Sequence, residues 1–156
     1  MSEMASTPAA EPDPLALDRQ LCFQFYAANN LIHRLYAPVL GALGLTYPQY
    51  LVMLVLWERD GLSVGALGQR LYLDSGTITP LLKRMEALGL LRRERDRADE
   101  RRVLVHLTEE GRSLRARAIT VPETMTRGQE VGHLEALRET ISGLVELLAA
   151  AQPARG

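Results

Sequence analysis

Cys22 is the residue of this chain whose thiol could carry redox chemistry, and it is the single cysteine among 156 residues. An internal disulfide is therefore excluded. A reactive thiol requires thiolate character, which comes from a nearby cation, from hydrogen-bond donors or from a helix N-terminus. Arg19 lies one turn before Cys22 but has Asp18 beside it, and a helix that begins near Pro14 would leave Cys22 beyond the strong part of the helix dipole. The alternative is an inert cysteine that fills a helical core.

A second group of residues, between Leu62 and Gly111, has the pattern of a nucleic-acid-binding module. A short helix is predicted over Ser63–Leu71, followed by a turn at Asp74-Ser75-Gly76 and a second helix that ends near Gly89. An arginine-dense hairpin covers Arg92–Arg102. Two helices joined by a tight turn, with a charged β-hairpin behind them, predict a winged helix-turn-helix, whose second helix fits the DNA major groove.

Charge is concentrated in this module. The whole chain has a formal net charge of −1, which argues against a protein that coats nucleic acid indiscriminately. From Arg70 to Arg102 there are nine Lys and Arg residues against six Asp and Glu residues. A local excess of positive charge fits a specific DNA reader, because phosphate contacts need cations only at the interface. A solvated charged surface is the alternative.

The start of the second helix is ambiguous because Pro80 lies within the helical pattern. Pro80 would sit best at the first helical position after a Thr79 cap, whereas a start at Asp74 would require a locally broken first turn. Both remain open from the sequence. The apolar stripe of this helix is predicted to be buried and consists of Ile78, Leu81, Leu82, Met85 and Leu88.

Further helices flank the module. They are predicted over Leu15–Leu43 with a bend near Pro38, over Pro48–Glu58, from Thr108 to before Pro122, and over Glu130–Ala151. The first and last helices carry more apolar surface than the small module can cover, so a homodimer packed through the chain ends is expected. The two apolar stripes are Leu17, Leu21, Phe25, Ala28, Ile32, Leu35 and Val39, and Leu134, Leu137, Ile141, Leu144 and Leu148.

The predicted fold is mainly α with a small β-hairpin wing, built as one integrated domain. Residues 1–14 are expected to be a disordered tail, residues 15–45 and 108–152 a helical dimerisation region, and residues 46–107 the winged helix-turn-helix. The longest apolar run, Tyr50–Trp57, is too short to cross a membrane, and no signal peptide opens the chain. A cytoplasmic protein with no membrane partner is expected.

The helix order, residues 71–86 (LYLDSGTITPLLKRME) and the wing residues 99–102 (DERR) resemble the MarR family of bacterial transcriptional repressors. The segments 20–23 (QLCF), 46–50 (TYPQY) and 73–77 (LDSGT) resemble its organic hydroperoxide-sensing branch (OhrR), of the one-cysteine type. The resemblance implies a double-stranded DNA partner with a pseudo-palindromic operator. It implies major-groove contacts from Ser75, Thr77, Thr79 and Arg84, and a minor-groove contact from Arg101 steadied by Asp99. For Lys83, Arg84 and Arg97, phosphate contact or solvated surface is an equal alternative.

In the resembling branch two tyrosines hold the sensing cysteine, and the matching residues here are Tyr36 and Tyr47. Fourteen residues separate Cys22 from Tyr36, about 21 Å along a straight helix, so only Tyr26 easily reaches the thiol on its own helix. Tyr36 would have to come from the other subunit. The resulting hypothesis is that an organic hydroperoxide oxidises Cys22 to a sulfenic acid and that the dimer then releases its operator. The sulfenic acid would react with a small cellular thiol or a backbone nitrogen, or be overoxidised.

Two rival functions remain. One is a MarR-type repressor released by a small phenolic ligand, with Cys22 structural; the other is a thiol peroxidase that uses Cys22 as its nucleophile. We expect no enzyme and no cofactor, because no phosphate-cradling glycine motif, nucleophile elbow or paired catalytic carboxylates are found. His33, His106 and His133 lack metal-ligand spacing with Cys22, so no metal site is expected.

Overall fold

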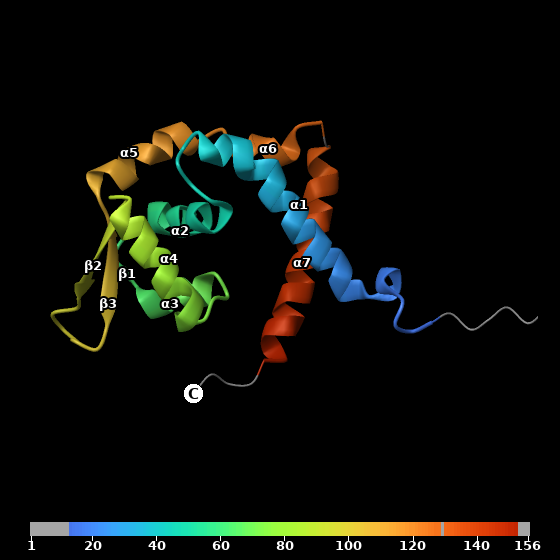
Figure 1. Ribbon diagram of the computed structural model, residues 1–156, viewed down its shortest axis with the longest axis horizontal. Coiled ribbons are helices and arrows are strands. Elements are labelled where there is room, and N and C mark those ends of the chain that lie inside the picture. The colour runs from blue at the N-terminus through green and yellow to red at the C-terminus, as the bar shows by residue number, and fades with distance from the viewer. Residues whose placement is uncertain (1–12, 129, 153–156) are drawn as a thin grey trace, which may run out of the picture. The chain divides into compact units, whose positions relative to one another are not determined.

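The computed structural model describes residues 13–128 and 130–152, which are mainly helical with one small sheet (Figure 1). This confirms the predicted fold class. The described chain falls into two compact units, one that ends at Arg34 and one that begins at Leu35. The elements are η1 (Leu17–Arg19), α1 (Leu21–Gly41), α2 (Tyr47–Glu58), β1 (Leu62–Ser63), α3 (Val64–Arg70), α4 (Ser75–Ala87), β2 (Leu91–Arg95), β3 (Val103–Leu107), α5 (Glu109–Ala118), α6 (Glu123–Thr126) and α7 (Val131–Ala150).

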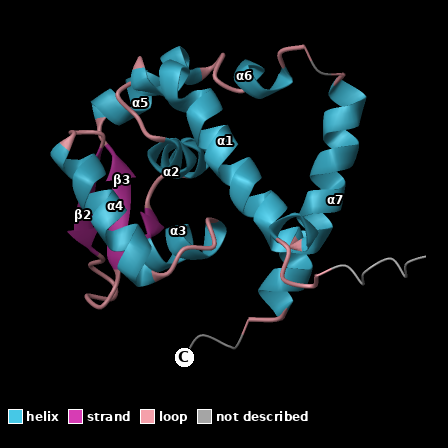
Figure 2. Cartoon of the chain, turned by 45° about the vertical axis from the view of Figure 1, so that its right-hand side comes forward, coloured by secondary structure: helices cyan, strands magenta, loops and turns pink. Residues whose placement is uncertain are grey.

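The sheet is antiparallel, with strand order β1-β3-β2 (Figure 2). β2 and β3 form the predicted hairpin, in a register that pairs Arg93 with Val105. On its other edge, β3 pairs with the two-residue strand β1, in which Leu62 lies opposite Val105. β1 was not predicted, because two residues are too few to show an alternating pattern.

The core of the second unit lies between α2, α3, α4 and the sheet. Its fully buried side chains include Val52 and Met53 of α2, Leu67 of α3 and Val105 of β3. In α4 the predicted stripe is confirmed for Ile78, Leu81, Leu82 and Met85, which are all buried. The prediction that Leu88 is buried is wrong, because its side chain is 54% exposed. It follows the last residue of α4, and the chain turns away at Gly89, whose φ is +75°, so Leu88 leaves the helical periodicity.

Polar contacts join helix α5 to this core. The indole nitrogen of Trp57 in α2 donates to the carbonyl oxygen of Gly111 in α5, at 2.9 Å. The Asp60 carboxylate accepts from the backbone N–H of Leu107 at 2.9 Å and from the Arg112 guanidinium at 2.8 Å. These bonds hold α2, β3 and α5 in one arrangement, which fixes the base of the hairpin.

Helix α1 begins six residues later than the predicted start at Leu15. Gln20 is extended, with φ −82° and ψ 108°, and its side-chain amide donates to the carbonyl oxygens of Pro14 and Ala16. The 3-10 turn η1 is therefore separated from α1, which then continues through Pro38. The tail predicted for residues 1–14 lies largely outside the described residues. A short helix, α6, was not predicted and follows directly after Pro122.

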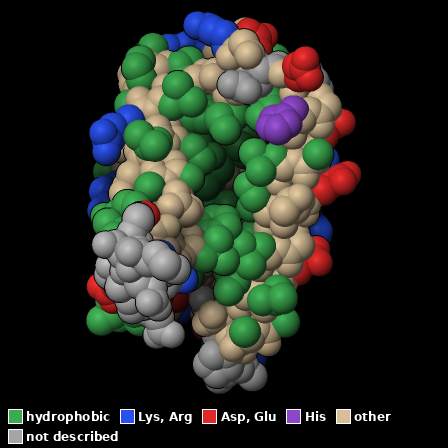
Figure 3. Space-filling view, turned by 90° about the vertical axis from the view of Figure 1, so that its right-hand side faces the viewer, with side chains coloured by type: hydrophobic (Ala, Val, Ile, Leu, Met, Phe, Trp, Pro, Cys, Tyr) green, Lys and Arg blue, Asp and Glu red, His purple; other side chains and the backbone are tan. Residues whose placement is uncertain are grey.

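The helix α7 exposes its apolar stripe. Among its described side chains none is buried, and Leu137, Ile141 and Leu148 are large exposed hydrophobic residues. Figure 3 shows hydrophobic side chains gathered along this helix, with acidic side chains at its outer edge. Helix α1 likewise exposes Phe25 and Leu35. In the described part of the chain, no helix combines the length and the hydrophobicity that a bilayer crossing requires.

Candidate nucleic-acid interface and sensing thiol

Helix α4 begins at Ser75, and Asp74 caps it. The Asp74 Oδ1 atom accepts a hydrogen bond from the backbone N–H of Thr77 at 2.8 Å. Of the two starts that the sequence leaves open, the helix takes the one at Asp74 and not the one at a Thr79 cap. Pro80 lies inside the helix and costs one hydrogen bond, the one that its missing N–H would give to the carbonyl oxygen of Gly76. The cap and the buried stripe that begins at Ile78 outweigh that loss.

The face of α4 opposite the core is polar and open. Ser75 and Thr77 in its first turn are exposed, as are Lys83 and Arg84 near its end, and Thr79 is half-buried. Short hydroxyl side chains at a helix N-terminus let phosphates and base edges approach closely. The two cations extend the same surface. The predicted DNA-facing residues of α4 are therefore accessible, with Thr79 the most sheltered of them.

In the wing, Asp99 holds Arg101 in a two-point ion pair. The Arg101 Nε and Nη2 atoms donate to the two carboxylate oxygens of Asp99, at 3.0 and 3.2 Å. The Arg101 side chain is otherwise 90% exposed. The hydrogen bond from Arg101 holds the pKa of Asp99 below its ordinary value, and the same bond raises the pKa of Arg101. Arg101 is therefore a charged side chain that is oriented yet open to a ligand.

Further pairs stiffen the wing. Arg102 lies 3.5 Å from Asp96, and Arg92 lies 3.7 Å from Glu94. The Arg95 guanidinium donates to the carbonyl oxygen of Glu100 at 3.0 Å. Exposed pairs of this kind add little stability each. Arg97, in the turn between β2 and β3, is exposed.

Sequence reasoning missed two residues that join α4 to the wing. Glu86, in the last turn of α4, accepts hydrogen bonds from both the backbone and the side chain of Arg93 in β2. Those bonds hold the pKa of Glu86 below its ordinary value. Seven residues separate the partners across a turn, and no local periodicity marks such a pair, so only the folded chain reveals it.

Cys22 is the second residue of α1 and is exposed. The expectation that it lies beyond the strong part of the helix dipole is therefore wrong, because α1 begins at Leu21 and places Cys22 in the first turn. Unpaired backbone N–H groups in that turn favour a nearby negative charge. Tyr26, one turn further along, is exposed, and its ring lies 6.5 Å from that of Phe23.

Three tyrosines cluster in the second unit. The ring of Tyr47 lies 5.1 Å from that of Tyr36 and 6.3 Å from that of Tyr50. Burial raises the pKa of all three hydroxyls, and for Tyr36 the proximity of Tyr47 raises it further. All three are therefore hydrogen-bond donors at neutral pH. Cys22 and Tyr26 belong to the unit that ends at Arg34, and the three clustered tyrosines to the unit that begins at Leu35.

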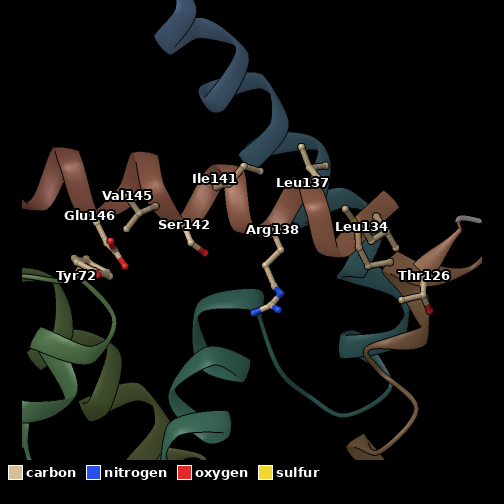
Figure 4. A pocket seen from close by; sticks show the side chains of 10 residues that line it. Tyr72, Thr126, Leu134, Leu137, Arg138, Ile141, Ser142, Val145 and Glu146 are labelled. Carbon is tan, nitrogen blue, oxygen red and sulfur yellow. The ribbon is translucent and has the colours of Figure 1, made fainter. Parts of the chain in front are cut away.

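The described residues contain no group of three or more His, Cys, Asp or Glu side chains arranged to hold a metal ion. His106 lies 3.2 Å from Glu94, on the sheet. A cavity of about 580 Å³ lies along α7 (Figure 4). Its walls are largely apolar, with Leu134, Ile141 and Val145 from α7 and Met125 from α6; Arg138 and Glu146 are its charged lining residues.

The arrangement matches known regulators. The family model described as transcriptional regulator SarA/Rot matches residues 34–117, from the end of α1 to α5. The organic hydroperoxide resistance transcriptional regulator of Bacillus subtilis is 46% identical over 136 residues, which cover 87% of this chain and 92% of that protein. The chain belongs to the MarR family of winged-helix transcriptional regulators. Within that family, this identity places it in the organic hydroperoxide regulator branch.

Two other relatives of this MarR-family chain extend the comparison. The HTH-type transcriptional regulator TtmR of Methylorubrum extorquens is 57% identical over 113 residues, 72% of this chain, although the chain spans only 58% of that protein. The solved structure of reduced AbfR bound to DNA has a TM-score of 0.71 at 32% identity, and covers 88% of this chain and 97% of its own. AbfR is from Staphylococcus epidermidis and has also been solved in an overoxidised form bound to DNA and in a disulfide form.

Proposed function

We propose that this chain is a DNA-binding repressor that organic hydroperoxides inactivate by oxidising Cys22. One observation carries the proposal: the single cysteine is exposed in the first turn of α1, in a chain 46% identical to an organic hydroperoxide resistance regulator. The surface of α4 and the paired Arg101 of the wing supply the DNA-reading part. The redox part rests on the position of the thiol.

The acting form in this proposal is a homodimer, working in the cytoplasm on double-stranded DNA. The exposed apolar stripes of α1 and α7 are the surfaces that a second copy of the chain would bury. Contiguous exposed apolar faces are typical of interaction surfaces. Two-fold symmetry would also place two α4 helices in successive major-groove half-sites of a pseudo-palindromic operator.

In each subunit, α4 would read the major groove through Ser75, Thr77 and Thr79. Lys83 and Arg84 would contact phosphates or bases further along. Arg101, oriented by Asp99, would enter the minor groove, where a narrow A·T-rich segment attracts arginine. Arg97 at the turn of the wing would contact the phosphate backbone, which contributes affinity but no sequence preference.

The chemical step begins with the Cys22 thiolate. Its sulfur attacks the terminal oxygen of the hydroperoxide, a sulfur–oxygen bond forms, and the oxygen–oxygen bond breaks with departure of an alkoxide. The hydroperoxide leaves as an alcohol after taking up a proton, and the sulfur is oxidised by two electrons to a sulfenic acid. With no second cysteine in the chain, a small cellular thiol would then form a mixed disulfide and release water.

Tyrosine hydroxyls would orient the thiolate. Tyr26 can reach Cys22 along α1, whereas Tyr36 lies fourteen residues away on that helix, about 21 Å along its axis. Tyr36, together with Tyr47, would therefore approach Cys22 from the other subunit. Oxidation at such a position breaks contacts between subunits, changes the separation of the two α4 helices, and so releases the operator. A few kcal/mol of differential stability is sufficient.

The test is a gel-shift titration on DNA upstream of the chain's own gene, with and without cumene hydroperoxide. Wild type is expected to release the DNA once treated, and Cys22→Ser to bind it equally well and ignore the peroxide. Mass spectrometry then identifies the oxidised state of Cys22. Because overoxidised AbfR was solved bound to DNA, the mixed disulfide and the sulfonic acid are to be assayed separately. Release of Cys22→Ser by peroxide would refute the sensor assignment.

A thiol peroxidase is separated from a sensor by stoichiometry. With excess hydroperoxide and a thiol donor, a peroxidase turns over many times, whereas a sensor consumes about one equivalent per subunit before it is reduced. The curated relatives are named as transcriptional regulators. We therefore expect single-equivalent consumption.

A second candidate function rests on the cavity along α7. Its apolar walls and its Arg138 side chain suit a small phenolic acid, which would make the chain a ligand-released repressor with Cys22 structural. The same face, through Leu137 and Ile141, belongs to the apolar stripe that the dimer would cover. Two results would favour this candidate. The Cys22→Ser protein would release the operator when 4-hydroxybenzoate is added, and the Arg138→Ala protein would not.

A further inference from the structure

Glu86 and Arg93 form a three-bond connection between the recognition helix α4 and the wing. The backbone N–H of Arg93 donates to the Glu86 Oε1 atom at 2.8 Å. The Arg93 Nε and Nη2 atoms donate to Oε2 at 3.1 and 2.9 Å. The side chains are only 36% and 23% exposed, so this pair is more sheltered than the other ion pairs of the wing. The guanidinium nitrogens converge on one carboxylate oxygen and the backbone N–H takes the other, so both oxygens of Glu86 are held by Arg93.

The connection also covers the outer edge of the sheet. β2 is an edge strand, because β3 lies between it and β1. Arg93 lies opposite Val105 of β3, and its N–H is directed to Glu86 rather than to the ladder. A carboxylate from α4 therefore takes the place of a further strand at this point. The strand is tied to the helix partly through its own backbone N–H, so motion of the Arg93 side chain alone cannot release it.

This connection lies beside the space between the two DNA-reading elements. Arg93 lines a cavity of about 350 Å³ whose other walls include Thr79 of α4 and Arg101 of the wing. Thr79 and Arg101 are residues that the proposed function assigns to the major and minor grooves. Arg93 thus borders the same space as the two side chains that are proposed to read the DNA.

We propose that Glu86 and Arg93 are positioning residues that set the wing against α4, so that one DNA register satisfies both the α4 surface and Arg101. Neither residue needs to touch DNA in this role. The inference rests on the proposed DNA-reading function. It adds that specificity depends on a helix-to-strand contact outside the base-reading side chains.

The test is a double-mutant cycle between Glu86→Ala and Arg101→Ala. The probe is a duplex that the wild-type protein selects from a random DNA pool, and a matched duplex has G·C pairs in place of the A·T pairs beside each half-site. In wild type, Arg101→Ala is expected to weaken binding about tenfold. In the Glu86→Ala background the same change is expected to have less than about a twofold effect, because the wing is no longer placed to reach the minor groove.

The matched control is Glu58→Ala, which removes the exposed ion pair between α2 and Arg70 of α3. In that background Arg101→Ala should keep its full effect. Glu86→Gln, which retains an oxygen acceptor for the Arg93 N–H, should restore part of the coupling. Melting temperatures show separately whether each variant folds. If Glu86→Ala does not fold, the double-mutant cycle is carried out with Glu86→Gln in its place.

The outcomes distinguish failure of the positioning role from failure of the proposed DNA-reading function. A tenfold effect of Arg101→Ala in both backgrounds would overturn the positioning role while leaving the DNA-reading function intact. If Arg101→Ala has no effect even in wild type, or the protein selects no duplex, the proposed function itself fails. Loss of preference for the A·T-flanked duplex in Glu86→Ala, at retained melting temperature, supports the positioning role, because a purely structural contact would not change that preference.

Discussion

The ring of Tyr36 packs against the ring of Tyr47, with 5.1 Å between centroids and 54° between planes. Burial raises the pKa of both hydroxyls, so both remain donors at neutral pH. If these hydroxyls hold the Cys22 thiolate, Tyr36→Phe should slow its oxidation by organic hydroperoxide about tenfold, since a hydrogen bond to a charged group is worth about 1.5–3 kcal/mol. Stopped-flow consumption of cumene hydroperoxide measures this rate, and DNA affinity should be unchanged.

Tyr50→Phe is the matched control for that experiment. Tyr50 is the third ring of the cluster, 6.3 Å from Tyr47, and burial likewise raises the pKa of its hydroxyl. It is not among the residues expected to orient the thiol. Equal slowing by Tyr36→Phe and Tyr50→Phe would mean that cluster packing, and not a bond to Cys22, controls the rate.

Arg101 should contribute both affinity and minor-groove preference. Its charge is oriented by Asp99 but remains exposed, so DNA can replace water around it without breaking a buried pair. Arg101→Ala is expected to weaken operator binding about tenfold and to lower the slope of log affinity against log salt by about one. Fluorescence anisotropy at several salt concentrations measures both values. Arg115→Ala, the same charge change on α5, should alter neither.

The recognition-helix stripe could be predicted from the sequence because burial there follows helical periodicity alone. Ile78, Leu82 and Met85 recur at three- and four-residue spacing, and each is buried. The helix start could not be predicted in the same way. Local preference favours Pro80 in the first turn, whereas the folded chain keeps Asp74 as the cap and accepts one lost hydrogen bond. Tertiary burial of the stripe decides between two locally reasonable starts.

The residues that the sequence assigns to the candidate site stay predictions, and their geometry could not be read from the sequence. The position of Cys22 depends on where α1 begins, and that depends on Gln20, whose extended backbone ends the preceding turn. No apolar pattern signals such a break. The Glu86–Arg93 connection was missed for a related reason, because it joins two elements through a turn and acts partly through a backbone N–H. Patterns of side chains cannot show backbone partners.

Asp60 should make the fold sensitive to acid. Its burial raises the pKa of the carboxyl group, but hydrogen bonds from the Leu107 N–H, the Arg112 side chain and the Gly61 N–H lower it more in sum, so its pKa lies below the ordinary value. A carboxylate with a lowered pKa contributes stability that is present above its unfolded pKa and is lost as pH falls through its folded pKa. Loss of this contribution is therefore expected below about pH 4.

Asp60→Asn tests this expectation. The variant should be less stable than wild type at pH 7, and the difference should shrink as pH falls below about 4, because wild type then loses the same charge. Urea unfolding at a series of pH values, at fixed protomer concentration, measures the gap. Asp99→Asn, which alters an exposed ion pair of the wing, should change stability little at any pH. If the difference in unfolding free energy between wild type and Asp60→Asn stays constant with pH, the Asp60 charge does not contribute to stability.

Gly111 is expected to tolerate no side chain. A Cβ atom there would collide with the carbonyl oxygen of Leu90, which is held in place because it accepts a hydrogen bond from the Thr108 N–H at 3.1 Å. The Gly111 carbonyl is itself bound by Trp57, so α5 cannot shift without loss of that bond. Gly111→Ala should therefore cost about 3 kcal/mol and lower the melting temperature by about 10 °C.

Gly65→Ala is the control, since a Cβ there meets no atom within 4 Å, and it should stay within about 1 kcal/mol of wild type. If both variants melt alike, the backbone of Leu90 moves more freely than its contacts indicate.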